Sequence, residues 1–448
     1  MDDTESGSRE LTLDEAVTVA IVLQNNGRLE EAQELYQHVL QAAPDFPRAL
    51  HFAGVLAHQQ LRHDEALTLI ARSLELQPGE ADWYSNLGIV HQASGEIERA
   101  IDAYQRAIAL DPDHANAYSN LGVVLRASGK PVDAERAYRT AIQLNPQHID
   151  AYHNLGILLA ALNRTREAAA CFCKVITLRP KHRDARRLLA LAHATVGELD
   201  EAAGVLREWL EEEPGNPVAL HMLAACSGRD VPPRASDQFV ERTFDGFAAS
   251  FESKLQQLSY RAPLLIAAQL EASGTAAAGR LDVLDAGCGT GLCGPLVAPY
   301  ARRLTGVDLS SGMLARAEEK RTYDALIKSE LTDYLRGNPE AFDLIVAADA
   351  LVYFGELASV LASAARALRP DGLLIFTLEH APESSGAADY RLEFHGRYSH
   401  TVEYVEGLLA AFALEPTITR AELRLEGGVP VDGLLVRARR PSERGASA

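Results

Sequence analysis

The sequence predicts an all-α solenoid followed by an α/β domain with a mostly parallel sheet. Three observations carry this prediction. Small residues and prolines recur at a constant step of 34 along the first half of the 448-residue chain, which is typical of stacked helical repeats. Strand and helix patterns alternate along the second half, which favours a layered α/β fold. A Pro/Arg-rich stretch without helical periodicity, SGRDVPPRAS at 227–236, separates the two halves.

The repeat is visible in three residue series. Glycine, alanine and proline each recur every 34 residues, at Gly54, Gly88, Gly122 and Gly156, from Ala32 to Ala202, and from Pro44 to Pro214. The units at 81–114 and 115–148 each contain two helices with apolar periodicity, broken at Gly95 or Gly129. Small residues allow the paired helices to approach, and we expect Tyr104 to fill the groove between them. Pro112 ends the second helix because proline supplies no N–H.

These units resemble the tetratricopeptide repeat (TPR). The resemblance implies six repeats over 13–216 and a capping helix, PVALHMLAAC, so that a TPR domain occupies 13–224. A polar tail at 1–12 precedes this domain and a linker at 225–236 follows it. An array of this kind presents a concave surface lined by the first helix of each repeat.

Asparagine recurs on the first helix of three successive repeats, as Asn86, Asn120 and Asn154. The TPR resemblance implies that these side chains form a ladder of amides on the concave wall. Each amide offers one donor group and one acceptor to an extended peptide backbone. We therefore expect this surface to bind a peptide or protein partner. The alternative is that asparagine is simply frequent at this repeat position.

Five apolar segments of the second half are expected to be largely buried strands. In chain order they are LDVLDAG, RRLTGVDL, FDLIVAADA, GLLIFTLE and GLLVRARR. The first leads into a glycine-rich turn, VLDAGCGTG, in which Asp285 ends the strand and Gly287, Gly289 and Gly291 follow. Glycines there let the backbone approach a ligand closely, and the amides of the next helix N-terminus face that ligand. The second strand ends in Asp308, an acid suited to accept hydrogen bonds from ribose hydroxyls.

Two cofactor classes compete for this turn. Gly289, Gly291 and Gly294 spell GxGxxG, a pattern that also occurs in dinucleotide-binding domains. Asp285, however, lies two residues before the first glycine, where a carboxylate repels a pyrophosphate but attracts the ammonium of S-adenosylmethionine. The sequence therefore favours S-adenosylmethionine.

The segments GVDLSSGMLARA, FDLIVAADALVYF and RALRPDGLLIFTLE resemble class I S-adenosylmethionine-dependent methyltransferases in order and spacing. The resemblance covers 237–441, followed by a tail at 442–448, and implies a seven-stranded sheet with its last strand, about 433–439, antiparallel. It implies cofactor binding by Asp285, Gly287, Cys288, Gly289, Gly291, Asp308, Leu309, Met313, Glu330, Leu331 and Asp349. In this resemblance Met313 faces the adenine, Glu330 contacts the adenine amine, and Asp349 lies beneath the methyl group. The third strand, in YDALIKSE, has a weak pattern.

The joined arrangement resembles a group of predicted bacterial methyltransferases that contain TPR repeats. In this sequence, FDGFAASFESKLQQLSYRAPLL and the late GRYSHTVEYVEGLL follow the array. The segment 239–270 is amphipathic and rich in aromatic residues. Its rings are expected either to cover the cofactor or to pack on the sheet as core residues; they are Phe244, Phe247, Phe251 and Tyr260.

Absent motifs limit the methyl acceptor. The fourth strand ends in AADAL rather than in the Asn/Asp-Pro-Pro-Tyr arrangement of amide and base N-methyltransferases, and the sequence has no paired-glutamate loop of arginine methyltransferases. A hydroxyl, amine, thiol or carboxylate acceptor remains. His400 is a candidate general base near neutral pH, with Tyr353 and Tyr398 as further catalytic candidates. Arg397 is suited to clamp a carboxylate or phosphate on the substrate. The alternative for His400 is a structural or surface group.

Composition limits partners and location. The net charge of −19 argues against nucleic acid or an anionic membrane as partner, and no apolar run reaches the ~18 residues that span a bilayer. The N-terminus is acidic and polar, unlike a secretory signal. We therefore expect a cytoplasmic protein. The five scattered cysteines show no CxxC spacing, so the sequence predicts neither a metal site nor a disulfide framework.

Together these patterns predict a methyltransferase that converts S-adenosylmethionine into S-adenosylhomocysteine and whose TPR domain recruits a peptide or protein, the substrate itself being one candidate. Two alternatives stay open. One is a small-molecule methyltransferase that uses the repeats for assembly. The other is a scaffold whose methyltransferase domain binds the cofactor without turnover.

Overall fold

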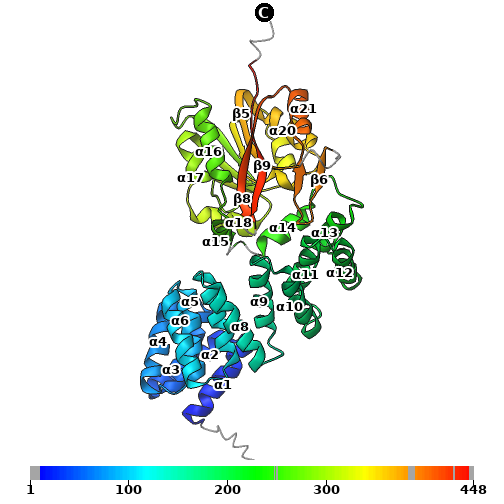
Figure 1. Cartoon of the computed structure of the whole chain (residues 1–448). Coiled ribbons are helices and arrows are strands. Elements are labelled where there is room, and N and C mark those ends of the chain that lie inside the picture. The colour runs from blue at the N-terminus through cyan, green and yellow to red at the C-terminus, as the bar shows by residue number, and fades with distance from the viewer. Residues whose placement is uncertain (1–10, 247, 249–250, 382–388, 427–428, 443–448) are drawn as a thin grey trace, which may run out of the picture. The chain divides into compact units, whose positions relative to one another are not determined.

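The computed structural model describes residues 11–246, 248, 251–381, 389–426 and 429–442 (Figure 1). The chain consists of two compact units, Met1–Ala185 and Arg186–Ala448. Among the described residues, no helix has both the length and the apolar character needed to cross a membrane.

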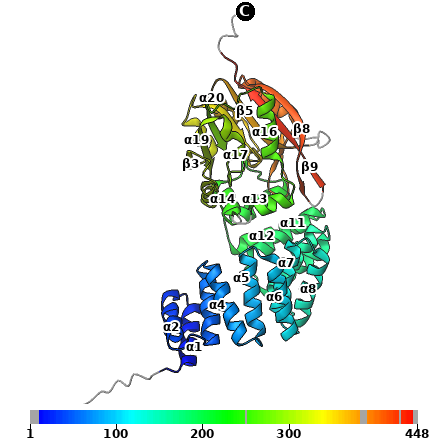
Figure 2. The same cartoon turned by 90° about the vertical axis from the view of Figure 1, so that its left-hand side faces the viewer.

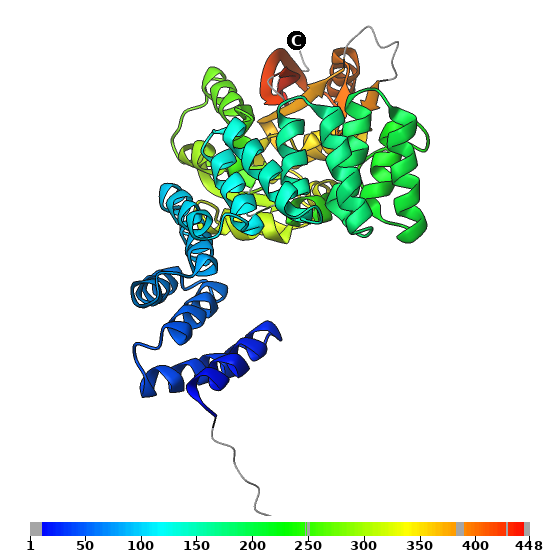
Figure 3. The ribbon, with the colours of Figure 1, turned by 60° about the horizontal axis from the view of Figure 1, so that its bottom comes forward.

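The first unit is built from consecutive helix pairs, which follow one another in Figure 3. The pairs are α1 (Leu13–Asn25) with α2 (Leu29–Ala42), α3 (Pro47–Gln59) with α4 (His63–Leu76), α5 (Ala81–Ala93) with α6 (Ile97–Leu110), α7 (Ala115–Ala127) with α8 (Pro131–Leu144), and α9 (Ile149–Ala161) with α10 (Thr165–Leu178). These are TPR-like repeats, and each pair falls within one predicted 34-residue unit.

The recurring glycines explain how the helices of a pair approach each other. A Cβ atom on Gly122 would lie 2.5 Å from the ring of Tyr138, and one on Gly156 would lie 2.6 Å from the ring of Phe172. Both rings are fully buried. The first helix therefore lacks a side chain at this point, and the aromatic ring of the second helix fills the space, as close packing requires.

The second unit begins with the last helix pair and a capping helix. Its helices up to the sheet are α11 (Arg183–Thr195, which starts at the unit boundary), α12 (Leu199–Glu212), α13 (Pro217–Ser227), α14 (Asp237–Asp245), α15 (Phe251–Gln257) and α16 (Ala262–Ala272). Ala190, Leu206, Trp209 and Met222 share one buried apolar cluster, so α11, α12 and α13 pack together. Asn216 caps α13, since its side chain accepts hydrogen bonds from the amides of Val218 and Ala219.

The described strands form one mixed sheet in the order β3-β2-β1-β4-β5-β7-β6, with β9 paired to β5 and β8 paired to β9. The strands are β1 (Leu281–Ala286), β2 (Ala301–Asp308), β3 (Ala325–Lys328), β4 (Phe342–Ala347), β5 (Leu368–His380), β6 (Tyr390–Leu392), β7 (Tyr398–His400), β8 (Glu415–Glu426) and β9 (Val429–Arg439). Strands β1 to β5 are parallel, and β9 is antiparallel to β5 as expected. The expected count of seven strands is wrong: β6 and β7 are added, and strands of three residues leave no periodic pattern to detect.

Helices cover both faces of the sheet. The connecting elements are α17 (Gly294–Val297), η2 (Ala298–Tyr300), α18 (Ser311–Glu319), α19 (Leu331–Arg336), η3 (Leu351–Tyr353), α20 (Ala358–Ala367) and α21 (Val402–Ala411). Val283 of β1 belongs to the core cluster with α16 and α17, whereas its neighbour Leu284 belongs to the cluster with α19, α20 and α21. Successive side chains of a strand point to opposite faces, so these clusters lie on opposite faces of the sheet. Figure 1 shows α16 and α17 on one side of the strands and α20 and α21 on the other.

The β6–β7 hairpin extends the sheet at the carboxyl end of β5. Strand β7 pairs with β5 only at Glu379 and His380, whereas β9 pairs with the preceding part of β5, from Leu373 to Glu379. The hairpin therefore stands at the edge of the sheet where the parallel strands end, which is where ligands bind in open α/β folds.

Candidate functional site

A cavity of about 360 Å³ opens at the carboxyl ends of β1, β2 and β4. It is lined by all of the expected cofactor-binding residues except Gly291: Asp285, Gly287, Cys288, Gly289, Asp308, Leu309, Met313, Glu330, Leu331 and Asp349. Tyr353, Arg397, Arg424 and Glu426 line it as well. The structure thus brings together residues that lie far apart in the sequence, on the side of the sheet where the order of strands reverses between β1 and β4.

The glycine turn after β1 adopts the backbone conformation that its sequence predicts. Gly287 has φ +72° and Gly289 has φ +53°, values that favour glycine because it lacks a Cβ atom. A Cβ on Gly287 would lie 2.4 Å from Cβ of Ala350. Gly291 has φ +83° and packs against Tyr323 and Ala317 instead of lining the cavity. Its role is therefore to shape the turn.

Asp285 is a buried acid at the cavity wall. It is 1% exposed, and the Tyr323 hydroxyl donates a 2.6 Å hydrogen bond to its Oδ2. Burial raises the pKa of Asp285 to about 7, an effect that the Tyr323 hydrogen bond only partly opposes. A cation beside this carboxylate would favour its charged form, so Asp285 suits the ammonium of a methionyl group.

Asp308 closes the other side of the turn. Its Oδ2 accepts a hydrogen bond from the Gly289 amide at 2.9 Å, and its Oδ1 accepts one from the Ser310 amide at 2.8 Å. Burial nevertheless raises the pKa of Asp308, because it outweighs the backbone hydrogen bonds that favour the charged form. The carboxylate is thus fixed in orientation and keeps lone pairs for a ligand's hydroxyl groups.

The adenine end expected from the resemblance contains Met313 and Glu330. Met313 is 1% exposed and its amide donates to the Ser310 hydroxyl, the N-cap of α18. Glu330 caps α19 by accepting from the Asp333 amide at 2.8 Å and from the Thr332 hydroxyl at 3.0 Å. The backbone of this helix start therefore orients Glu330, and both residues line the cavity. The cavity wall offers one carboxylate suited to an ammonium, Asp285, a second carboxylate suited to ribose hydroxyls, Asp308, and an apolar side chain, Met313. These groups fit the chemistry of S-adenosylmethionine.

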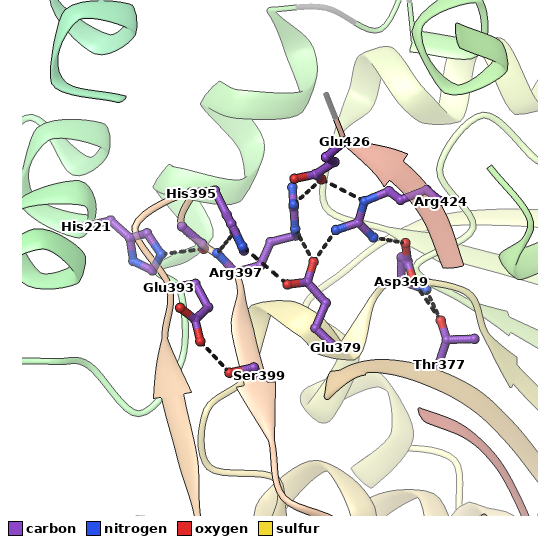
Figure 4. A network of polar contacts seen from close by, with 11 residues as sticks. His221, Asp349, Thr377, Glu379, Glu393, His395, Arg397, Ser399, Arg424 and Glu426 are labelled. Carbon is purple, nitrogen blue, oxygen red and sulfur yellow. Dashed lines mark hydrogen bonds and ion pairs between the residues drawn. The ribbon is translucent and has the colours of Figure 1, made fainter. Parts of the chain in front are cut away.

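A network of charged side chains borders the cavity (Figure 4), and four of its members line it: Asp349, Arg397, Arg424 and Glu426. The Thr377 hydroxyl donates to Oδ1 of Asp349 at 2.7 Å, and Nη1 of Arg424 donates to Oδ2 at 3.0 Å. Asp349 has φ +51°, a conformation that costs free energy in a residue other than glycine and that often marks functional sites. Burial raises the pKa of Asp349 although Arg424 opposes this effect.

Glu379 links the two arginines of this network. Nε of Arg397 donates to Oε1 of Glu379 at 2.5 Å, and Arg424 donates to the same oxygen. Both arginines also donate to Oε1 of Glu426. Burial alone would raise the pKa of Glu379, but Arg397, His395 and Arg424 together lower it to about 2. The guanidinium of Arg397 is therefore held by carboxylates of the chain itself.

Two of the catalytic candidates do not reach the cavity. His400 is 0% exposed, its Nε2 lies 3.1 Å from the Gly355 carbonyl, and burial lowers its pKa to about 4. Tyr398 is also 0% exposed, and its hydroxyl donates to the Pro232 carbonyl at 2.7 Å. Neither residue lines the cavity. This corrects the expectation of a general base at His400, because a strand of the added hairpin directs both side chains into the protein.

Tyr353 and the aromatic segment do line the cavity. Phe244, Phe251 and Tyr260 belong to its wall, and Phe244 meets Tyr353 edge to face with ring centroids 5.4 Å apart. Phe247 lies outside the described residues. Burial raises the pKa of Tyr353 to about 12, so its hydroxyl stays protonated at neutral pH and is able to donate a hydrogen bond.

Sequence reasoning missed Thr377, Glu379, Arg424 and Glu426. Arg424 and Glu426 belong to β8, a strand that we did not predict, although the alternation in TITRAELRLE is a strand signal. Thr377 and Glu379 lie within a segment that the sequence marks only as a buried strand. Among the described residues, no group of three or more His, Cys, Asp or Glu side chains could hold a metal ion.

Comparisons with known proteins match both parts of the chain. A family model described as "Methyltransferase domain" matches residues 284–376, and one described as "Cilia and flagella-associated protein 70 C-terminal domain" matches residues 7–225. A crystal structure of MamA is 28% identical, with a TM-score of 0.33, over 37% of this chain and 97% of that chain.

Two curated relatives match the second part. Ubiquinone biosynthesis O-methyltransferase of Sodalis glossinidius is 28% identical over 171 residues, which cover 36% of this chain and 68% of that protein. The probable S-adenosylmethionine-dependent methyltransferase CRG1 of Saccharomyces cerevisiae is 31% identical over 110 residues, which cover 23% of this chain and 38% of that protein. The chain therefore carries a methyltransferase domain behind a TPR-like helical repeat region.

Proposed function

We propose that the protein is an S-adenosylmethionine-dependent methyltransferase whose TPR region recruits a peptide or protein that carries the methyl acceptor. The observation that carries this proposal is the cavity at the carboxyl ends of β1, β2 and β4, lined by Asp285, Gly287, Gly289 and Asp308. The methyltransferase family model matches 284–376, from within β1 to within β5, and so includes the same turn. The boundaries 13–224 for the TPR domain and 237–441 for the catalytic domain are part of the proposal.

The cofactor supplies a methyl group on a sulfonium, which is already a good electrophile. The chain has to bind this cofactor, align the acceptor with it and exclude water. In our proposal Asp308 accepts hydrogen bonds from the ribose hydroxyls, Asp285 attracts the ammonium, and Met313 contacts the adenine. The buried carboxylate of Asp285 matches the charged ammonium of the cofactor, and the apolar side chain of Met313 matches the flat adenine ring.

The acceptor end has an aromatic wall and a set of paired charges. Phe244, Phe251 and Tyr260 are suited to exclude water from the reacting atoms. Because the hydroxyl of Tyr353 stays protonated and is able to donate a hydrogen bond, we propose that it orients an acceptor oxygen or nitrogen and does not remove its proton. Arg397 is only 20% exposed through its side chain and is held by Glu379 and Glu426, which supports a role in shaping this end.

Recruitment is proposed from the asparagine ladder. Asn86, Asn120 and Asn154 lie on α5, α7 and α9, the first helices of three successive pairs, and all three are half-buried. Nδ2 of Asn86 lies 3.0 Å from Nε2 of His51, so a neighbouring side chain orients this amide. A half-buried, oriented amide loses little conformational entropy on binding a peptide.

A methylation assay on the proteins of a cell extract tests both the methyl transfer and the recruitment by the TPR region. The assay measures the formation of S-adenosylhomocysteine and the transfer of a labelled methyl group to those proteins. We expect the wild-type chain to label one or a few proteins, and Asp308→Ala to abolish the labelling. The triple variant Asn86→Ala/Asn120→Ala/Asn154→Ala should reduce it, whereas Gln105→Ala/Arg106→Ala, at exposed positions of α6, should not.

Two results would replace the proposal with its alternatives. Full labelling by the asparagine variant, or labelling of small molecules only, would contradict recruitment and favour assembly as the role of the repeats. Binding of S-adenosylmethionine without transfer to any acceptor would favour a non-catalytic scaffold.

A further inference from the structure

We propose that His221, on the capping helix of the repeats, is a positioning residue for the acceptor end of the methyltransferase cavity. This inference rests on the proposed function and extends it to a residue outside the expected catalytic domain. It concerns only the second unit, in which α13 and α14 lie side by side (Figure 2).

The first step is the contact between α13 and the β6–β7 hairpin. Nε2 of His221 lies 2.8 Å from the Gly396 carbonyl oxygen, and since that oxygen can only accept, Nε2 carries the proton. The imidazole is 5% exposed and packs on the Phe239 ring at a centroid distance of 4.0 Å. Burial lowers the pKa of His221. Nε2 can donate to the Gly396 carbonyl in either protonation state of the imidazole, so the hydrogen bond does not depend on this shift.

The second step leads from Gly396 into the cavity. Gly396 has φ +89°, a conformation that fixes the direction of the next residue, Arg397. The amide of Glu393 donates to the Arg397 carbonyl at 2.9 Å, which closes the hairpin turn. Arg397 then reaches Glu379, and through it Arg424 and Asp349. Figure 4 shows this series of contacts from His221 to Asp349.

Apolar packing supports the same contact. Ala224 of α13 shares a buried cluster with Leu392 and Tyr398 of the hairpin, and Phe394 packs against the cluster that holds α11, α12 and α13 together. The hairpin thus rests on the capping helix over several residues, in addition to the hydrogen bond from His221.

The segment between α13 and α14, expected to be a linker, fixes a second cavity residue. The Ala235 amide donates to the Tyr353 carbonyl at 2.8 Å, and the Pro233 carbonyl accepts from the amides of Gly355 and Glu356 at 2.9 and 2.7 Å. Ala235 itself lines the cavity. Tyr353 and Arg397 are therefore both held by residues that precede the expected catalytic domain, so this domain and the capping helix build the acceptor end together.

Reaction of arginine side chains with phenylglyoxal in the full chain tests this role. The rates are read peptide by peptide by mass spectrometry. We expect His221→Ala to raise the rate at Arg397 about tenfold, the equivalent of one lost hydrogen bond, with little change at Arg424. His221→Gln should restore the wild-type rate, because a glutamine amide N–H can replace the Nε2 donor. The matched control is His193→Ala on α11, whose imidazole contacts Glu198 and not the hairpin; it should leave both rates unchanged.

An unchanged rate at Arg397 in folded His221→Ala, or no restoration by His221→Gln, would overturn the inference. If His221→Ala does not fold, His221→Asn replaces it, because the shorter asparagine side chain cannot reach Gly396. His221→Asn should then raise the rate at Arg397 relative to His221→Gln. Equal rates in these two variants would also overturn the inference. Calorimetry with S-adenosylmethionine separates this result from the proposed function. All His221 variants should bind the cofactor as the wild type does, whereas absence of binding to the wild type contradicts the proposed function alone.

Discussion

The Tyr323 hydroxyl and the Asp285 carboxylate form a 2.6 Å hydrogen bond at the carboxyl end of β1. Tyr323 is the only hydrogen-bond partner found for this side chain among the described residues, and the carboxylate is 1% exposed. A buried acid with one neutral partner is destabilising as a structural element. Its position in the cavity wall is explained if a cationic ligand completes it.

Asp285→Asn should therefore stabilise the folded protein at neutral pH and weaken the binding of the cofactor. The pKa of Asp285 is raised from 3.8 to about 7, so the unfolded chain ionises first and the folded state is penalised as pH rises from about 4 to 7. We expect the variant to gain about 4 kcal/mol in free energy of unfolding at pH 8, the linkage value for a pKa difference of this size, and the gain to vanish towards pH 4. Thermal unfolding between pH 4 and 8 measures this difference.

Asp282→Asn on the same strand is the control with the opposite sign. Burial would raise the pKa of Asp282, but Arg302 and Arg369 lower it. This acid stabilises the folded state above its ordinary pKa and loses that contribution as pH falls. Asp282→Asn should destabilise the protein at pH 8, and a stabilising effect there would contradict our interpretation of both carboxylates.

Glu379→Gln should destabilise the second unit strongly. Arg397 and Arg424 both lose a buried carboxylate, and breaking a buried ion pair costs about 3–5 kcal/mol. The pKa of Glu379 is lowered to about 2, so the difference from the wild type should persist at neutral pH and shrink only as pH falls below about 4.

Urea unfolding measures the loss in free energy of unfolding caused by Glu379→Gln and compares it with the loss caused by the control variant Glu340→Gln. Glu340 pairs with Arg440 at 2.9 Å at the surface, where an ion pair contributes about 0–1 kcal/mol. Equal losses in the two variants would show that the buried network does not hold the acceptor end together.

Gly122→Ala should destabilise the repeats even though alanine favours helices. The added Cβ would lie 2.5 Å from the Tyr138 ring, and such overpacking costs about 1–3 kcal/mol, more than the gain of about 1 kcal/mol in helix propensity. Gly204→Ala in α12 meets no atom within 4 Å and should gain about 0.4–1 kcal/mol. Thermal melts followed by circular dichroism measure the stability of both variants relative to the wild type. A Gly122→Ala variant as stable as the wild type would refute the packing role of the glycine series.

The sequence predicts best where one residue type has one physical use. Gly287 and Gly289 need positive φ values, and Gly122 must leave room for a ring, so the spacing of these glycines is enough to predict the turn and the repeats. Arg397, Arg424 and Asp349 are different. The residues that Arg424 joins lie 45 and 75 positions away in the chain, and no local pattern marks such a pair.

His400 shows a second reason why the site could not be predicted fully from the sequence. Its neighbours in the sequence resemble a catalytic cluster, but β7 pairs with β5 at Glu379 and His380, and this register directs His400 into the protein. Register follows from tertiary packing of the hairpin, which three-residue strands do not encode locally. The contact of His221 with Gly396, 175 positions apart, was beyond prediction for the same reason.

Calorimetric titration of the full chain with S-adenosylmethionine tests the central claim most directly. We expect saturable binding at one site, a loss of affinity of about 100-fold in Asp308→Ala, since two charge-assisted hydrogen bonds disappear, and wild-type affinity in Glu318→Ala, an exposed acid on α18. Absence of binding to the wild-type chain, or equal affinity of Asp308→Ala and the wild type, would contradict the proposed cofactor site.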